Sequence, residues 1–150
     1  MFTIEKPKEI HLNSWKEIIN ESASSNSFQF EEVNFSLFWT CIFRDDYFAF
    51  AAKNEDKFMG IVVAKINETY YEKNIVLDVL YVLQDFRKIG VARALMNKIE
   101  EIAKEKNLDL IIKGVEKSNL LAQKLFKNYA VVNRTRSVSY THLTLPTMLP

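Results

Sequence analysis

The chain has 150 residues, of which 48% are hydrophobic and 26% are charged. This length and composition are typical of one soluble globular domain, and they exclude disordered and fibrous proteins. Lys and Arg number 20 and Asp and Glu 19, which leaves a net charge of +1. No global field therefore directs the chain to nucleic acid or to an anionic membrane, and we expect neither among its partners.

Cysteine content and the N-terminal segment bear on location. The one cysteine, Cys41, cannot form an internal disulfide, and the first eight residues carry charges where a signal peptide is apolar. The sequence has no run of 18 apolar residues of the kind that spans a membrane. We therefore expect a cytoplasmic protein. Because His11 and Cys41 have no partners at ligand or triad spacing, no metal site is expected.

The spacing of apolar residues predicts an α/β fold, a mixed sheet with helices on its faces. The strand over 75–83 is apolar except for Asp78, which is typical of a strand buried on both faces. The clearest amphipathic helix follows Gly90. In chain order the predicted elements are strand 3–4, helix 9–21, Ser-rich loop 22–27, helix 28–43, a hairpin of strands 47–52 and 58–66, strand 75–83, helix 90–106, strand 108–115, helix 118–129 and strand 130–136.

The last 14 residues, 137–150, have no charged residue and hold two of the three prolines. The string Val138–Thr147 resembles a translated sequencing adapter. On that interpretation residues 1–137 are one domain that lacks its own C-terminus, and 138–150 are a non-native tail. The alternative is a natural edge strand, because Thr and Leu alternate with other residues in it. In either case we exclude the segment from the functional interpretation.

The sharpest local feature is the loop that joins the buried strand to the long helix. Unpaired N–H groups at a helix N-terminus and the helix dipole together favour an anion. Gly90 lets the backbone approach a pyrophosphate closely, and Ala92 leaves the first turn open. Arg87 and Lys88 add mobile positive charge at the rim. On these residues alone, a tight turn with a solvated rim is an equally good interpretation, and the glycine spacings of Rossmann and P-loop sites are absent.

Two segments resemble motifs of one family. Arg87-Lys88-Ile89-Gly90-Val91-Ala92 resembles the Q/R-x-x-G-x-G/A acyl-CoA loop of the GNAT N-acetyltransferase superfamily. Asn119-Leu-Leu-Ala122-Gln-Lys-Leu125-Phe126 is similar to that family's N-x-x-A-x-x-L-Y motif. The resemblance implies a mostly antiparallel, twisted sheet of about six strands with helices on both faces. It also implies transfer of an acetyl group from acetyl-CoA to a primary amine by direct attack in a ternary complex.

The resemblance implies roles for single residues. Leu80, Tyr81 and Val82 would lie beside the pantetheine arm, where a backbone N–H would polarise the thioester carbonyl. The loop from Arg87 to Arg93 would hold the pyrophosphate. Asn119 would touch the cofactor arm, although it has an alternative role as a helix cap.

Phe126 departs from the family, which often has a Tyr there whose hydroxyl protonates the departing thiolate. Phe126 can pack against the cofactor, but it has no proton to donate. A non-catalytic acyl-CoA-binding module on the same fold is therefore an alternative. A third possibility, a nucleotide-binding α/β domain, is disfavoured by the missing glycines.

Asp78 is the candidate general base, because it is the one carboxylate in the buried strand and some family members have an acidic residue there. Burial would raise its pKa and suit it to accept the amine proton, directly or through water. Alternatively, Asp78 is structural, either bonding backbone at a strand splay or facing solvent.

The acceptor is expected to be a small-molecule or peptide amine, with its specificity set by the first two helices and the final hairpin. Candidates for lining an apolar pocket are Phe28, Phe30, Phe35, Phe38 and Trp39, and Glu31 and Glu32 would attract a cationic amine. The favoured interpretation is that most of these aromatics belong to the core. We expect the protein to be a monomer or a homodimer.

Overall fold

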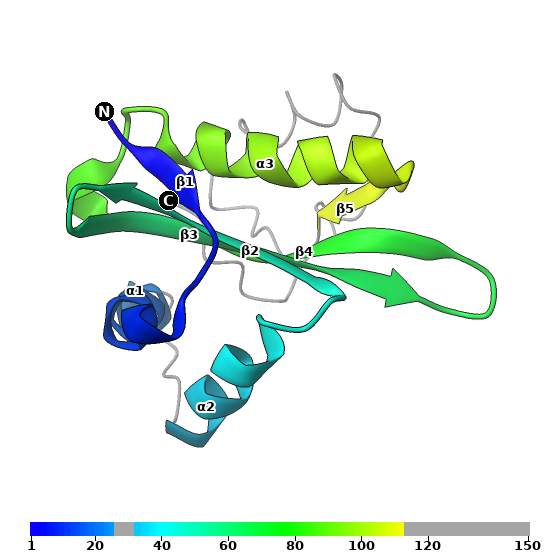
Figure 1. Ribbon diagram of the computed structural model, residues 1–150, viewed down its shortest axis with the longest axis horizontal. Coiled ribbons are helices and arrows are strands. Elements are labelled where there is room, and N and C mark those ends of the chain that lie inside the picture. The colour runs from blue at the N-terminus through cyan, green and yellow to red at the C-terminus, as the bar shows by residue number, and fades with distance from the viewer. Residues whose placement is uncertain (26–31, 113–150) are drawn as a thin grey trace.

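The computed structural model describes residues 1–25 and 32–112, which form one sheet with helices on both faces (Figure 1). In chain order the elements are β1 (Thr3–Glu5), η1 (Glu9–His11), α1 (Leu12–Ser25), α2 (Glu32–Cys41), β2 (Tyr47–Asn54), β3 (Lys57–Glu68), β4 (Lys73–Val82), η2 (Gln84–Phe86), α3 (Val91–Lys106) and β5 (Leu110–Ile112). The predicted α/β class is confirmed. The predictions of a helix over 118–129, a strand over 130–136 and a non-native tail over 138–150 fall outside the described residues.

The five strands form one sheet in the order β1-β2-β3-β4-β5. Neighbouring strands are antiparallel except β4 and β5, which run parallel because α3 carries the chain back along the sheet. β2 and β3 form the predicted hairpin, with Tyr47 opposite Lys65 and Asn54 opposite Lys57. The sheet is therefore mostly antiparallel, as the family resemblance implied.

One face of the sheet is covered by α3. Because side chains alternate along a strand, Val62, Leu80 and Val82 point to this face, where they form a core with Leu95 and Ile99 of the helix. Those five side chains are at most 1% exposed. The amphipathic pattern that predicted α3 from the sequence is therefore the pattern that buries it.

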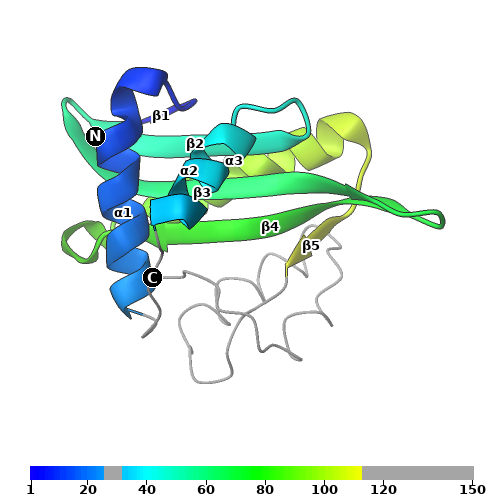
Figure 2. The same cartoon turned by 90° about the horizontal axis from the view of Figure 1, so that it is seen from below.

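The opposite face is covered by α1 and α2 (Figure 2). Ile61 and Tyr81 point to this side and share a second core with Trp15 of α1 and Phe35 of α2. Within the described ranges, no helix has the length and apolar character needed to cross a membrane.

α1 extends further than its sequence predicts. The Ser-rich stretch 22–27 predicts a loop, but the helix runs to Ser25, and Ser22 and Ala23 are buried. The Ser22 hydroxyl donates to the carbonyl oxygen of Ile19 at 3.1 Å, so its polar group is satisfied without leaving the helix. The loop prediction is therefore wrong for residues 22–25.

The aromatic residues of α2 pack mainly inward. Phe35 is 3% exposed and stacks on Trp39, with ring centroids 6.1 Å apart. Trp39 in turn meets Trp15 of α1 edge to face at 5.9 Å. The interpretation of these aromatics as core is confirmed for Phe35, whereas Phe38 and Trp39 are half-buried. The other predicted pocket aromatics, 28 and 30, lie outside the described residues.

Candidate active site

The chain passes from β4 into α3 through a loop with two left-handed residues. Lys88 has a φ of 67° and Gly90 a φ of 89°. A positive φ is uncommon for a residue with a side chain, such as Lys88, whereas glycine adopts it freely. A Cβ at Gly90 would meet no atom within 4 Å, so the backbone conformation, and not crowding, explains the glycine.

Within residues 1–25 and 32–112, no side chain caps the first turn of α3, and the turn itself holds no acidic residue. Its first intrahelical bond runs from the N–H of Ala94 to the carbonyl of Gly90 at 3.0 Å. The N–H groups of Val91, Ala92 and Arg93 therefore have no partner within the helix. Together with the positive end of the helix dipole, these three donors suit an anion.

A cavity of about 190 Å³ lies at this turn. It is lined by Val82, Phe86, Arg87, Lys88, Gly90, Val91, Ala92 and Arg93. The structure thus brings together most of the residues that the family resemblance assigns to the pyrophosphate. Ile89 does not line the cavity, and its side chain is 57% exposed.

Arg87 is fixed in place. Its Nε donates to the carbonyl oxygen of Val82 at 3.0 Å, and its guanidinium carbon lies 5.2 Å from the ring centroid of Tyr81. A guanidinium over an aromatic face is held by a cation–π interaction. The prediction of mobile charge is therefore wrong for Arg87, while Lys88 is exposed, as a rim residue is.

The backbone of β4 presents alternate residues to its two sides. The N–H of Leu83 donates to the carbonyl of Met59 at 2.9 Å, and Gly60 stands opposite Val82. In an alternating antiparallel ladder, this pattern directs the backbone groups of Leu80 and Val82 away from β3 and those of Tyr81 toward it. Of the three residues expected beside the pantetheine arm, Leu80 and Val82 thus offer backbone groups on the outer side of β4.

Glu21 of α1 is a site residue that sequence reasoning missed. Its Oε2 accepts a hydrogen bond from the Tyr81 hydroxyl at 3.0 Å and another from the N–H of Gln84 at 3.4 Å. The Tyr81 side chain is 1% exposed, and a buried hydroxyl needs a partner. Glu21 stands 60 positions from Tyr81 on an exposed turn of α1, so no local pattern links the two.

Asp78 lies on a β-bulge of β4. Val63 of β3 stands opposite Val79 and Ala64 opposite Leu77, which leaves Asp78 as the extra residue. The described pairing of β4 with β5 covers Ile75 to Leu77 and ends beside it. Bulges are common next to active sites because they redirect a side chain.

The bulge changes the surroundings predicted for Asp78. The side chain is 33% exposed, and its Oδ1 lies 3.9 Å from Nζ of Lys65, so β4 is not buried on both faces at this point. Burial nevertheless raises the pKa of Asp78, and the Lys65 ammonium opposes part of that rise. Burial, aided by Cys41 and Asp78, also raises the pKa of Tyr47, whose hydroxyl therefore stays protonated near this carboxylate.

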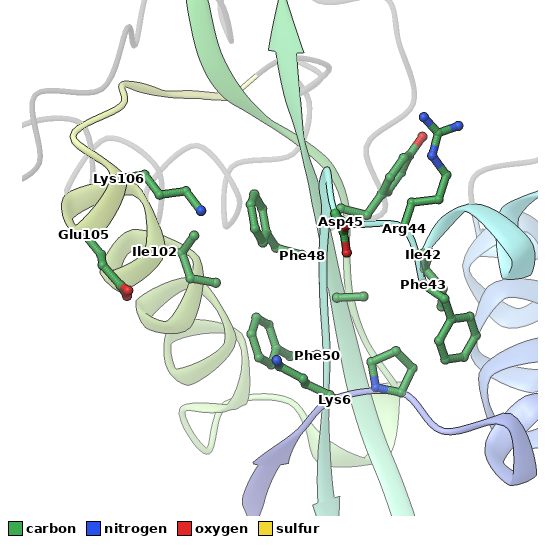
Figure 3. A pocket seen from close by; sticks show the side chains of 13 residues that line it. Lys6, Ile42, Phe43, Arg44, Asp45, Phe48, Phe50, Ile102, Glu105 and Lys106 are labelled. Carbon is green, nitrogen blue, oxygen red and sulfur yellow. The ribbon is translucent and has the colours of Figure 1, made fainter.

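A second cavity, of about 390 Å³, lies where β1 ends (Figure 3). β1 pairs with β2 only at residues 51–53, so the edge of β2 from Tyr47 to Phe50 extends past it. Phe48 and Phe50 point toward α3, where Nζ of Lys106 lies 5.6 Å from the Phe48 ring centroid. None of the predicted site residues that the structure describes lines this cavity.

Two predicted site residues, Asn119 and Phe126, fall outside the described residues, as do Glu31 and the side chain of Glu32. In the part of the chain that the structure describes, no group of three or more His, Cys, Asp or Glu side chains is placed to hold a metal ion.

Many solved structures share this fold. A possible acetyltransferase from Clostridium difficile 630 superposes with a TM-score of 0.72 at 15% identity, over 86% of this chain and 89% of that one. A transcriptional regulator from Bacillus halodurans C-125 gives 0.72 at 17% identity, over 86% and 91%. The aminoglycoside N-acetyltransferase AAC(6')-Iy, in complex with the bisubstrate analogue CoA-S-monomethyl-acetylneamine, gives 0.71 at 17% identity, over 85% and 88%.

The family assignment follows from a direct match of the sequence. The Acetyltransferase (GNAT) family matches residues 13–130, which is most of the chain. A comparison with curated proteins gave no match. The chain therefore belongs to the GNAT acetyltransferase family, as its two motifs indicated.

Proposed function

We propose that the protein transfers an acetyl group from acetyl-CoA to the primary amine of an acceptor. The observation that carries this proposal is the uncapped first turn of α3. Its N–H groups, which have no partner within the helix, surround one cavity at the end of β4 together with the left-handed Gly90 and three basic side chains. A pyrophosphate matches this combination of donors and positive charge.

In this proposal the donor lies along the outer side of β4. The N–H groups of Val91, Ala92 and Arg93 and the side chains of Arg87 and Lys88 bind the pyrophosphate. The pantetheine arm then follows the backbone of Leu80 toward the bulge. This course brings the thioester to the region of Asp78, where the described pairing of β4 with β5 ends.

The reaction is a direct transfer. The amine nitrogen attacks the thioester carbonyl carbon, the new C–N bond forms, the C–S bond breaks, and CoA leaves as its thiolate. Asp78 accepts the proton that the nitrogen loses, directly or through water. Its raised pKa makes it a better proton acceptor than an exposed aspartate, provided that it is ionised.

A small molecule is the favoured acceptor class. AAC(6')-Iy, which shares the fold, was solved with a bisubstrate analogue that joins CoA to acetylneamine. A peptide amine is the alternative acceptor. We expect the protein to act in the cytoplasm, as a monomer or a homodimer.

Donor binding is tested at Gly90. We expect acetyl-CoA to raise the melting temperature of the wild type, and Gly90→Glu to abolish the rise, because a carboxylate there repels the pyrophosphate. Gly90→Ala is the matched control, since it imposes the same unfavourable φ without the charge. A larger rise with ATP than with acetyl-CoA would contradict the proposal.

Catalysis is tested separately from binding. Release of the CoA thiol is followed across a panel of amines with wild type and with Asp78→Asn. The proposal expects turnover with at least one amine and a lower rate in the variant. Binding without turnover would support the alternative, a non-catalytic acyl-CoA-binding module, which the replacement of the family's Tyr by Phe126 favours. An unchanged rate in Asp78→Asn across pH would remove Asp78 as the base.

A further inference from the structure

Contacts through Tyr81 connect α1 to the pyrophosphate loop. Oε2 of Glu21 accepts a hydrogen bond from the Tyr81 hydroxyl at 3.0 Å. The ring of the same Tyr81 contacts Arg87, whose guanidinium carbon lies 5.2 Å from the ring centroid. Glu21 also accepts the N–H of Gln84 at 3.4 Å, at the point where β4 passes into η2. One carboxylate on α1 therefore accepts hydrogen bonds both from the β4 residue beneath Arg87 and from the first residue of η2.

The link limits the freedom of Arg87. The hydrogen bond from Nε to the Val82 carbonyl fixes one side of the guanidinium, and the Tyr81 ring supports its face. The two terminal nitrogens are left for an anion, and in residues 1–25 and 32–112 no carboxylate pairs with them. An arginine that is already ordered loses less side-chain entropy when it binds a phosphate group.

We propose that Glu21 is a positioning residue for the acyl donor. By fixing Tyr81, it holds the Arg87 guanidinium where the pyrophosphate of acetyl-CoA binds. Glu21 does not itself touch the donor. The inference rests on the proposed function, because it takes acetyl-CoA to be the ligand at the N-terminus of α3.

The test is a double-mutant cycle on CoA affinity, measured by calorimetric titration of CoA into the full chain. Glu21→Ala should weaken binding about fivefold, the size expected for loss of an ordered cation–π contact. In an Arg87→Ala background the same substitution should change the affinity less than about twofold, because Glu21 acts through Arg87. Glu17→Ala, one turn earlier on α1, is the matched control and should bind CoA as the wild type does.

Two milder variants separate positioning from folding. Tyr81→Phe keeps the ring but removes the hydroxyl, so it should weaken CoA binding in the same direction and lose its effect in the Arg87→Ala background. Glu21→Gln keeps an oxygen that accepts the same two hydrogen bonds, so its affinity should stay within about twofold of the wild type. In an acetyl-transfer assay, Glu21→Ala should raise the KM for acetyl-CoA and leave kcat unchanged.

The outcomes distinguish this inference from the function on which it rests. If the wild type does not bind CoA, the proposed function fails, and the inference fails with it. If the wild type binds CoA but Glu21→Ala does so equally well, only the positioning role is overturned. The positioning role is also overturned if the double variant loses affinity by the product of the two single losses, because Glu21 and Arg87 would then act independently. Should Glu21→Ala fail to fold, Tyr81→Phe decides: a CoA affinity equal to that of the wild type, or a loss that is undiminished in the Arg87→Ala background, overturns the positioning role.

Discussion

Single residues of the site show how far a local pattern determines its own surroundings. The sequence around Gly90 predicted a close approach to an anion or a tight turn before a helix, and the structure has Gly90 in the left-handed region there, with a φ of 89°. The ordering of Arg87 depends on Glu21 and Tyr81, which come from two other elements. The turn at Gly90 was therefore predictable from the sequence, and the contacts that order Arg87 were not.

The raised pKa of Asp78 predicts how the stability of the protein depends on pH. Because burial raises its pKa above the ordinary 3.8, the folded protein holds this proton more tightly than the unfolded chain does. The stabilisation from that proton is complete below about pH 3.8 and is lost as the pH rises through the folded pKa. Asn cannot ionise, so Asp78→Asn should have a higher free energy of unfolding than the wild type at pH 7, and the advantage should shrink toward pH 3.

The measurement for Asp78 is urea unfolding followed at several pH values. Asp45→Asn, at an exposed position of the loop before β2, is the control, and it should lack the pH-dependent advantage. A wild type that is more stable than Asp78→Asn at pH 7 would show that the Lys65 ion pair outweighs burial. In that case Asp78 would be a structural ion-pair partner and a poor candidate for the base.

At the scale of elements, β3 and β4 leave no room for a side chain at Gly60. A Cβ added there would lie 2.8 Å from the carbonyl oxygen of Tyr81 and 3.1 Å from Cα of Val82, and both atoms belong to the backbone. Because backbone atoms cannot rotate away, Gly60→Ala should push the strands apart and lower the free energy of unfolding by about 1–3 kcal/mol.

This prediction is checked by urea unfolding together with amide chemical shifts of β4. Gly90→Ala is a useful comparison, because its cost comes from φ and its Cβ meets no atom within 4 Å. We expect shifts along β4 from Gly60→Ala, and shifts confined to the loop from Gly90→Ala. Unchanged stability and unchanged β4 shifts in Gly60→Ala would show that the added Cβ is accommodated without separating the strands.

The elements differ in how well their sequences predicted them. α3 was predictable because a period of 3.6 residues places Leu95 and Ile99 on one stripe, and that stripe is what the sheet buries. The last turn of α1 was not, because its serines favour a loop locally while packing buries Ser22 and Ala23. The bulge at Asp78 was equally hidden, since it arises from the register of β3 against β4.

In the whole molecule, the sheet separates two cores that serve different parts of the proposed site. α3 brings the helix terminus and its basic residues to one end of β4, while α1 supplies Glu21 from the opposite face. Like β2 and β3, β4 has side chains in both cores, and it also carries Asp78. The geometry of the donor site therefore depends on the packing of both layers against a single strand.

The same arrangement predicts how a bound donor changes global stability. A ligand that binds only the folded state stabilises it by an amount that grows with its concentration, about 2.7 kcal/mol at one hundred times its Kd. If the phosphates of acetyl-CoA contact the α3 terminus, Arg87 and Lys88, the gain in melting temperature should fall between 0.05 and 0.5 M salt, because exposed charges are screened. S-acetylpantetheine has no pyrophosphate, so any gain that it gives should not depend on salt. A gain from acetyl-CoA that is equal at both salt concentrations would place its binding energy in the pantetheine arm, along β4, and away from the terminus of α3.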